Sequence, residues 1–320
     1  MKSQKLDIVS MVRKYMIFAL LVLVMIIFSF GSEYFLTASN LINVLRQSSV
    51  NGIVCVGMCF VMLTGGIDLS VGAVLGLSAV TCASLMVKMS FNPVPAVIVS
   101  LIIGAVVGFC NGILIDRVGI PALIATLGTM TSLRGLCFIL TGGLPVYGFT
   151  TSFGVIGKGY VGFIPVPVII MVIVLAVGAY VLNKTRYGRY LYAVGGNKEA
   201  SRLSGIPVNK VMIATYTISG LLAAIAGIVE LSRFSSGNPS AGDGYEMDAI
   251  TSVVLGGISV SGGEGKFYGV IAGIFLMSIL SNGLVMMNVQ SYWQQLIKGL
   301  VLIFAVGVDA LSKKAKTKTV

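Results

Sequence analysis

A glycine-rich stretch with a single carboxylate, TGGIDLSVG at 64–72, lies between two long apolar runs. An aspartate at the centre of a membrane-spanning helix costs roughly 2.5–3.5 kcal/mol on insertion scales, which argues against Asp68 facing lipid. Glycine-flanked breaks with polar groups are how transport proteins place backbone and side-chain dipoles beside a solute. The stretch therefore predicts a broken helix with Asp68 facing the protein interior near a solute pathway. A polar turn at the membrane surface is the alternative interpretation.

The other reactive residue types argue against chemistry on this chain. There is no histidine, which excludes histidine-ligated metals and histidine-based acid–base catalysis. The five cysteines lie in apolar runs without a C-x-x-C pair, so we interpret them as small buried hydrophobes. The segment SGGEGK at 261–266 fails as a phosphate loop because Val260 and Phe267 stand where glycine and a hydroxyl residue are required. We expect no catalytic residue, no metal and no cofactor, so any ATP must bind another chain.

Composition settles the broad class. The 320 residues are 56% hydrophobic and 10% charged, with a mean hydropathy of +0.98. Soluble domains carry about 25% charged residues, so this chain is a polytopic membrane protein. The net charge of +11 is explained by positively charged cytoplasmic loops, and we expect no nucleic-acid partner.

Apolar runs of about 20 residues mark the candidate spans. They predict an all-α membrane protein with about ten transmembrane helices, some broken or re-entrant, in one domain covering 1–320. The run at 41–64 begins with polar residues, and the run at 246–260 is short enough to be re-entrant. The predicted spans are 15–30, 41–64, 68–88, 94–115, 121–141, 164–182, 211–231, 246–260, 267–287 and 291–309.

The distribution of basic residues predicts the orientation. With ten crossings and a cytoplasmic N-terminus, 16 of the 22 lysines and arginines fall on the cytoplasmic side and four on the opposite side. This asymmetry is the one that the positive-inside rule describes. We therefore expect a multi-pass membrane protein with both termini in the cytoplasm.

The longest polar segment, 183–210, contains the signals of a short exposed helix. Asn197 is a good N-cap, Glu199 suits the positive end of the helix dipole, and Gly205 and Pro207 end the helix. A solvated connector is one interpretation. The other is a docking element for a second protein, formed by Asn197, Lys198, Glu199, Ala200, Arg202 and Leu203.

A short internal similarity links two distant segments. Residues 61–70 resemble residues 253–261 if one gap is allowed, and both combine an apolar run with paired glycines and a serine. Repeats that meet near the membrane centre are common in transporters.

Four motifs carry a family resemblance over most of the chain: TGGIDLSVG (64–72), TRYGRYLYAVGGNKEASRLSGI (185–206), AGDGYEMDAITSVVLGGISVSGGEG (241–265) and SYWQQLIKGLVLIFAVGVD (291–309). The chain resembles the permease subunits of bacterial ABC monosaccharide importers, and among them most closely those for ribose. One position departs from that pattern, because Gly65 stands where serine is expected.

The resemblance implies a translocation path for a monosaccharide without enzymatic activity on this chain. It also implies a location in the bacterial inner (plasma) membrane and a homodimer with a second copy of the permease in membrane lipid. The implied partners are a periplasmic sugar-binding protein and a cytoplasmic ATP-binding subunit that docks on the helix at 197–204.

A path for neutral, hydroxyl-rich sugars needs hydrogen-bonding groups more than charge. Helix-packing hydrogen bonds are the alternative role for each such residue. Gln294 and Gln295 are further candidates in the second half of the chain. The predicted pathway residues are Asn51, Thr64, Gly65, Gly66, Asp68, Ser70, Ser259 and Ser261.

Two other functions stay open from the sequence. An ion-coupled secondary sugar transporter would need several ionisable groups in its spans, whereas only Asp68, Arg134 and Lys298 are placed in or beside them. An ABC permease for xylose, galactose, a nucleoside or a branched-chain amino acid would share the broader fold.

Overall fold

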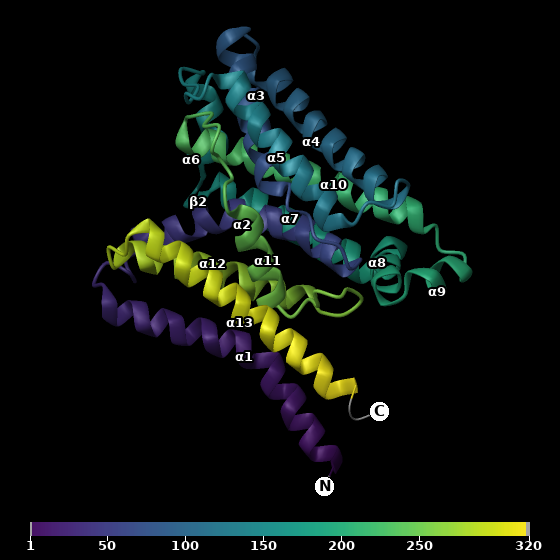
Figure 1. The fold of residues 1–320 in the computed structure, drawn as a ribbon. Helices are drawn as coiled ribbons and strands as arrows, with labels where there is room; N and C mark the ends of the chain where they lie inside the picture. The colour runs from purple at the N-terminus through teal and green to yellow at the C-terminus, as the bar shows by residue number, and fades with distance from the viewer. Residues whose placement is uncertain (1, 318–320) are drawn as a thin grey trace.

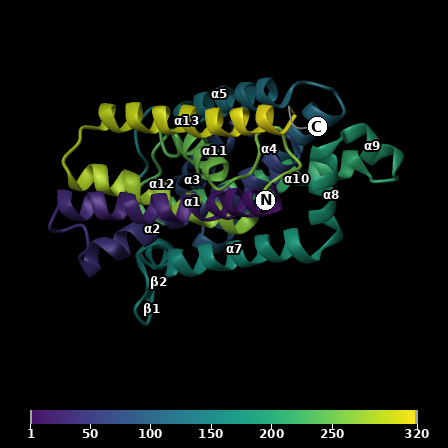
Figure 2. The ribbon, with the colours of Figure 1, turned by 90° about the horizontal axis from the view of Figure 1, so that it is seen from below.

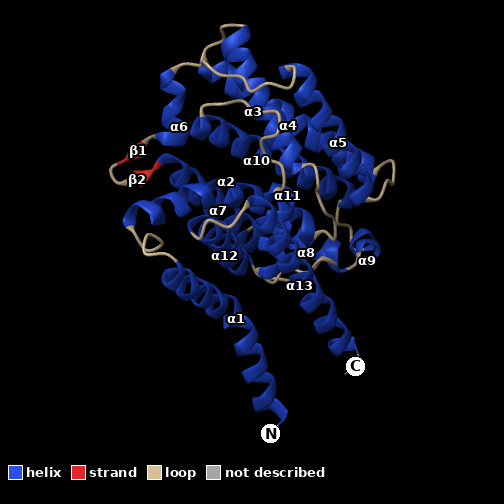
Figure 3. Ribbon diagram, turned by 60° about the vertical axis from the view of Figure 1, so that its left-hand side comes forward, coloured by secondary structure: helices blue, strands red, loops and turns tan. Residues whose placement is uncertain are grey.

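The computed structural model describes residues 2–317, and the side chains of residues 17–150 and 152–310. The described chain is helical apart from one 3-10 turn and one small hairpin (Figures 1 and 3). In chain order the α-helices are α1 Lys2–Gly31, α2 Ala38–Leu63, α3 Val71–Lys88, α4 Pro93–Asp116, α5 Ala122–Thr141, α6 Val155–Lys158, α7 Val166–Lys184, α8 Arg186–Gly196, α9 Lys198–Leu203, α10 Val208–Phe234, α11 Tyr245–Leu255, α12 Phe267–Met286 and α13 Ser291–Thr317.

Eight of the described helices are long and apolar enough to cross a membrane. They are α2, α3, α4, α5, α7, α10, α12 and the first 20 residues of α13. Helix α1 adds a shorter apolar stretch, Ile17–Gly31. Together with the half-length α11, these helices match the predicted runs one for one, and an all-α polytopic fold is confirmed.

Helix α10 is the central helix of the bundle and packs against α2, α3 and α4. Small residues make the α4 contact possible: a Cβ on Gly108 would clash with the backbone carbonyl of Tyr216, and one on Gly104 would lie 2.5 Å from the Ala224 Cβ. Because lipid is as apolar as leucine, such close backbone packing is what holds membrane helices together.

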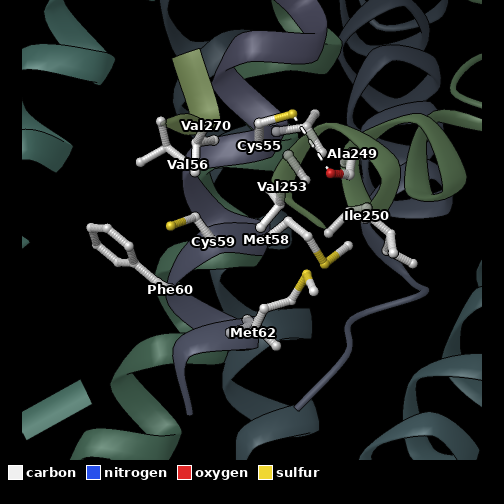
Figure 4. Close-up of a cluster of buried hydrophobic side chains, with 14 of the residues drawn as sticks. Cys55, Val56, Met58, Cys59, Phe60, Met62, Ala249, Ile250, Val253 and Val270 are labelled. Atoms are coloured by element: carbon white, nitrogen blue, oxygen red, sulfur yellow. Dashed lines mark hydrogen bonds between the residues drawn. The ribbon is translucent and has the colours of Figure 1, made fainter. Parts of the chain in front are cut away.

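Helix α2 forms the other half of the core. Figure 4 shows Cys55, Met58 and Met62 of α2 facing Ala249 and Val253 of α11, with Cys59 in the same cluster. Cys55 and Cys59 are fully buried free thiols, as predicted for cysteines that act as small hydrophobes.

The two ends of the bundle differ. Figure 2 shows the N-terminal end of α1, the C-terminal end of α13, and helices α8 and α9 toward the same end of the molecule. We call this the α8–α9 end. The opposite end, which we call the hairpin end, holds the antiparallel pair β1 (Tyr160–Val161) and β2 (Ile164–Pro165) (Figure 3).

Two elements differ from the sequence-based prediction. The run at 246–260 is helical only over Tyr245–Leu255, because Gly256 and Gly257 follow and the chain continues as a loop to 266. Gly257 has a φ of +85°, in the left-handed region that favours glycine. Helix α8 lies within the segment 183–210, where only one short helix was expected.

Candidate functional site

Asp68 lies in the loop 64–70 between α2 and α3, and its carboxylate accepts three hydrogen bonds. Ser70 donates to Oδ1 from its backbone N–H (3.0 Å) and from its hydroxyl (2.6 Å). The Ser219 hydroxyl of α10 donates to Oδ2 over 2.8 Å. Asp68 is 1% exposed and faces the protein interior as predicted, and its hydrogen-bond partners are Ser70 and Ser219.

The network extends from Asp68 into two more helices. The Asn111 amide of α4 donates to the Ser70 hydroxyl (3.0 Å), and the Thr129 hydroxyl of α5 donates to the Asn111 carbonyl oxygen (2.6 Å). Buried polar networks with satisfied members fix one arrangement of their helices. The loop 64–70 therefore locks α3, α4, α5 and α10 to one another.

The predicted glycine loops meet at the α8–α9 end. The Gly263 N–H donates to the Leu63 carbonyl oxygen over 2.9 Å, which joins the end of α2 to the loop 256–266. Within these loops Thr64 is buried and bonds the Val61 carbonyl (2.7 Å), Ser259 is buried, and Ser261 is exposed. A Cβ on Gly65 would lie 3.3 Å from the Ser261 carbonyl oxygen, so the two segments with internal similarity are in contact.

Asn51 lies apart from these loops. It is buried in the middle of α2, and its amide donates to the Ser252 hydroxyl of α11 over 3.3 Å. Asn51 therefore binds α2 to α11, the helix-packing role that Ser and Asn side chains commonly take between membrane helices.

A cleft of about 480 Å³ separates α11 from α13. Its volume falls within the roughly 300–1,000 Å³ typical of small-molecule sites. Lys298 of α13 crosses the cleft to Asp248 of α11, with a distance of 2.7 Å from Nζ to Oδ2. Polar side chains dominate the lining, which consists of Asp243, Gly244, Glu246, Met247, Asp248, Thr251, Ser291, Gln294, Gln295, Lys298, Gly299 and Leu302.

A second cleft, of about 460 Å³, lies on the other side of the loop 235–244. Arg134 of α5 holds that loop, donating from Nη1 to the backbone carbonyls of Pro239 (2.9 Å) and Ala241 (2.7 Å). The lining includes Tyr147, Glu230, Asn238 and Asp243. Both clefts lie toward the hairpin end, because Asp243 lines both and Val146 pairs with Gly237 beside them.

The clefts and the predicted pathway residues are different sets. Neither cleft is lined by a residue of the pathway prediction, whereas Gln294 and Gln295 do line the α11–α13 cleft. Sequence reasoning missed Glu230, Glu246 and Asp248, which supply carboxylates to the clefts. Their spacing in the sequence carries no signal, although AGDGYEM at 241–247 shows an acidic helix start after paired glycines.

Helix α9 is the exposed element that was predicted as a docking surface. The Asn197 side chain caps α9 by accepting from the Ala200 N–H over 2.9 Å, as expected. Leu203 is 88% exposed at the end of the helix. Glu199 and Arg202 pair over 3.3 Å on its surface.

Two contacts anchor α8 and α9 to the bundle. Lys198 reaches Asp116 at the end of α4, 3.4 Å from Nζ to Oδ1, and the Asp116 side chain is fully buried. The Tyr187 hydroxyl bonds the Thr215 hydroxyl of α10 over 2.8 Å. Burial raises the pKa of Tyr187 to about 12, so this phenol keeps its proton at neutral pH. The docking element is therefore held on α4 and α10.

Comparison with known proteins places the chain. Residues 40–306 match the family model described as "Branched-chain amino acid transport system / permease component". The chain is 47% identical over 295 residues to the ribose import permease protein of Escherichia coli strain K12, covering 91% of each chain. It is 43% identical to the ribose import permease protein of Bacillus subtilis (90% of each chain) and 38% identical to the D-allose transport system permease protein of Escherichia coli (94% and 93%). No solved structure matches.

Proposed function

The chain belongs to the family of permease components of the branched-chain amino acid transport system type, and from this membership we propose that it is the membrane permease of an ATP-driven importer of ribose. The observation that carries the proposal is the identity of 43–47% over nine-tenths of the chain to ribose import permeases of Escherichia coli and Bacillus subtilis. D-Allose, the solute of the relative at 38%, is also a neutral sugar.

The chemistry of the α11–α13 cleft supports a neutral solute. Lys298 is already paired with Asp248 there, so the amides of Gln294 and Gln295 supply donors and acceptors for hydroxyl groups. The Thr251 hydroxyl donates to the Met247 carbonyl oxygen and therefore offers an acceptor. A zwitterionic amino acid would require a cation and an anion of its own. This favours ribose over the branched-chain amino acids of the family description.

The proposed route runs from the hairpin end through the α11–α13 cleft to the α8–α9 end. On this route the loops 64–70 and 256–266 close the path in the present arrangement. Asn51, Thr64, Asp68, Ser259 and Ser261 would then act when those loops separate. The burial of four of these residues supports a role in the closed state: Asn51, Thr64, Asp68 and Ser259.

The proposed partners follow from the two ends of the bundle. A cytoplasmic ATP-binding subunit docks on α9 and hydrolyses ATP, so this chain is not itself an enzyme. A periplasmic sugar-binding protein docks at the hairpin end. A second copy of the permease and membrane lipid cover α5 and α13, whose apolar stretches are only 17% and 6% buried.

Uptake of labelled ribose tests the proposal. The chain is reconstituted in proteoliposomes with its ATP-binding subunit and sugar-binding protein, and we expect ATP-dependent uptake that excess leucine leaves unchanged. Gln294→Ala and Gln295→Ala should reduce uptake, whereas Gln290→Ala, an exposed glutamine before α13, should not. Uptake of leucine without ribose, or ribose uptake driven by an ion gradient without ATP, would overturn the proposal.

A charge-reversal series tests the docking surface. Glu199→Arg and Arg202→Glu each break the pair at 3.3 Å, and the double variant restores a pair of reversed polarity. If α9 docks on the ATP-binding subunit, the double variant should still co-purify poorly, because the charges presented to the partner stay reversed. Recovery of co-purification in the double variant would show that the pair serves only the helix.

A further inference from the structure

Three glycine segments from distant parts of the chain meet at the α8–α9 end. They are the end of α2 with its loop (63–65), the end of α8 (195–196) and the loop before α12 (261–263), and we call their contact the glycine junction. The Gly263 N–H donates to the Leu63 carbonyl oxygen (2.9 Å), so the α2 segment and the α12 loop are joined directly.

Helix α8 closes the junction by backbone contact alone. A Cβ on Gly195 would clash with the Leu63 carbonyl oxygen and lie 2.5 Å from the Gly263 nitrogen. A Cβ on Gly262 would lie 2.6 Å from the Gly65 nitrogen and 3.2 Å from the Gly195 Cα. Real Cβ atoms do not approach other atoms this closely, so each segment leaves no room for a side chain on the next.

A hydrogen bond outside the glycine junction supports the same connection. The Tyr192 hydroxyl of α8 donates to the Gly265 carbonyl oxygen over 3.1 Å. Burial raises the pKa of Tyr192, so the phenol stays a donor at neutral pH. Helix α8 is therefore held to the loop 256–266 at two points, through Tyr192 and through Gly195.

Each of the three segments of the junction leads to a different functional element. After Gly196, Asn197 caps the N-terminus of α9, the proposed docking helix. Beyond Gly65 lies Asp68, whose network locks α3, α4, α5 and α10. The third segment belongs to the loop 256–266, which follows α11, and α11 lines the α11–α13 cleft.

We propose that the glycine junction, with Gly195 as its positioning residue, transmits the displacement of the docking helix α9 to the Asp68 loop and to α11. Tightly packed backbones transmit a shift because they have no soft side chain to absorb it. The inference rests on the proposed function, since it concerns how ATP hydrolysis on another subunit reaches the sugar path. It adds the residues through which that coupling passes.

Adjacent glycines supply a matched pair of variants. Gly195→Ala inserts a methyl group into the junction, whereas a Cβ on Gly196 meets nothing within 4 Å. Both residues end the same helix, where alanine is otherwise preferred to glycine. The two variants therefore share their effect on helix propensity and differ in the contact.

The experiment measures the amount of ribose imported per ATP hydrolysed by the reconstituted complex. We expect Gly195→Ala to lower this ratio about fivefold or more, the lower range of coupling between sites, while the ATP-binding subunit still co-purifies. Gly196→Ala should stay near the wild-type ratio. Equal ratios for Gly195→Ala and Gly196→Ala would overturn the proposal, as would a loss of subunit binding by Gly195→Ala in a folded permease.

Tyr192→Phe decides the question if Gly195→Ala does not fold. It keeps the ring and removes only the bond to Gly265, so we expect the ratio to fall about 2- to 10-fold, the worth of one hydrogen bond. An unchanged ratio in a folded Tyr192→Phe protein would overturn the proposal. The wild-type complex reports separately on the proposed function, because absence of ATP-dependent ribose uptake there concerns the function and not the junction.

Discussion

At the residue scale, Asp68 is a buried carboxylate at the centre of a hydrogen-bond network that joins several helices. Its carboxylate accepts from the Ser70 N–H, the Ser70 hydroxyl and the Ser219 hydroxyl, and it lines neither of the two clefts described above. Hydrogen bonds to charged groups contribute about 1.5–3 kcal/mol each, so loss of the carboxylate affects stability before it affects a solute. The structure therefore directs the test of Asp68 toward folding.

We expect Asp68→Leu to reduce the amount of folded permease in the membrane severely, because it leaves the Ser70 N–H without its acceptor. Asp68→Asn should be intermediate, since its oxygen still accepts from Ser70 and its amide can donate to Ser219. Membrane abundance and uptake per folded molecule are measured together. Glu33→Gln, an exposed carboxylate, is the control. Normal abundance of Asp68→Leu with uptake abolished would instead place Asp68 on the pathway.

The sequence showed that Asp68 would be interior but not which residues would surround it. Insertion cost predicts that a carboxylate avoids lipid. It does not predict that Ser219, 151 positions away along the chain, donates to Asp68, or that Asn111, 43 positions away, donates to Ser70. The same limit applies to Asp116, whose buried carboxylate pairs with Lys198 of a helix distant in the sequence. Burial of a charge is decided by tertiary contacts, and one sequence does not contain them.

At the scale of elements, the long apolar helices were predictable because their length is set by the bilayer. The predicted span 94–115 is observed as Pro93–Asp116, and 121–141 as Ala122–Thr141. Helix α8 was missed because its residues are polar and aromatic and its apolar face is short. Helix α11 was expected to run to 260, but paired glycines end it at Leu255.

One ion pair joins α11 and α13 across the cleft between them. Lys298 and Asp248 lie 2.7 Å apart with side chains 26% and 22% exposed. Removing one partner leaves a largely buried charge unpaired, so we expect Lys298→Met to lower the unfolding temperature more than the double variant Lys298→Met/Asp248→Asn. Neighbouring groups in contact show interaction energies of about 0.5–3 kcal/mol in double-mutant cycles.

Thermal unfolding of the purified permease measures this coupling. Lys210→Met, which alters an exposed lysine, sets the baseline for loss of a positive charge. Strictly additive effects of the two single substitutions would show that the pair does not hold α13 against α11.

At the scale of the whole molecule, the N-terminal end of α1 and the C-terminal end of α13 lie toward the same end of the bundle as α8 and α9 (Figure 2). The excess of basic residues predicts that this end is cytoplasmic. Cysteines introduced at Ser204, after α9, and at Phe163, in the hairpin, report on the two faces, because both positions are exposed. The exposed native Cys110 is replaced by serine in both variants.

A membrane-impermeant maleimide should label Phe163→Cys in intact spheroplasts, and label Ser204→Cys only after the membrane is opened. The four other native cysteines are buried and give the background signal in the parent protein. Labelling of Ser204→Cys from outside, with Phe163→Cys protected, would invert the predicted orientation.

The glycine junction also bears on how such a protein can change its solute. Its contacts join main chain to main chain, so a substitution there has no neighbouring side chain that can shrink to compensate. The α11–α13 cleft is lined largely by side chains, which can be exchanged one at a time. Libraries intended to alter solute preference should therefore vary Thr251, Gln294 and Gln295 and keep the junction glycines constant. Such libraries vary the residues proposed to contact the solute and leave unchanged the residues proposed to couple uptake to ATP hydrolysis.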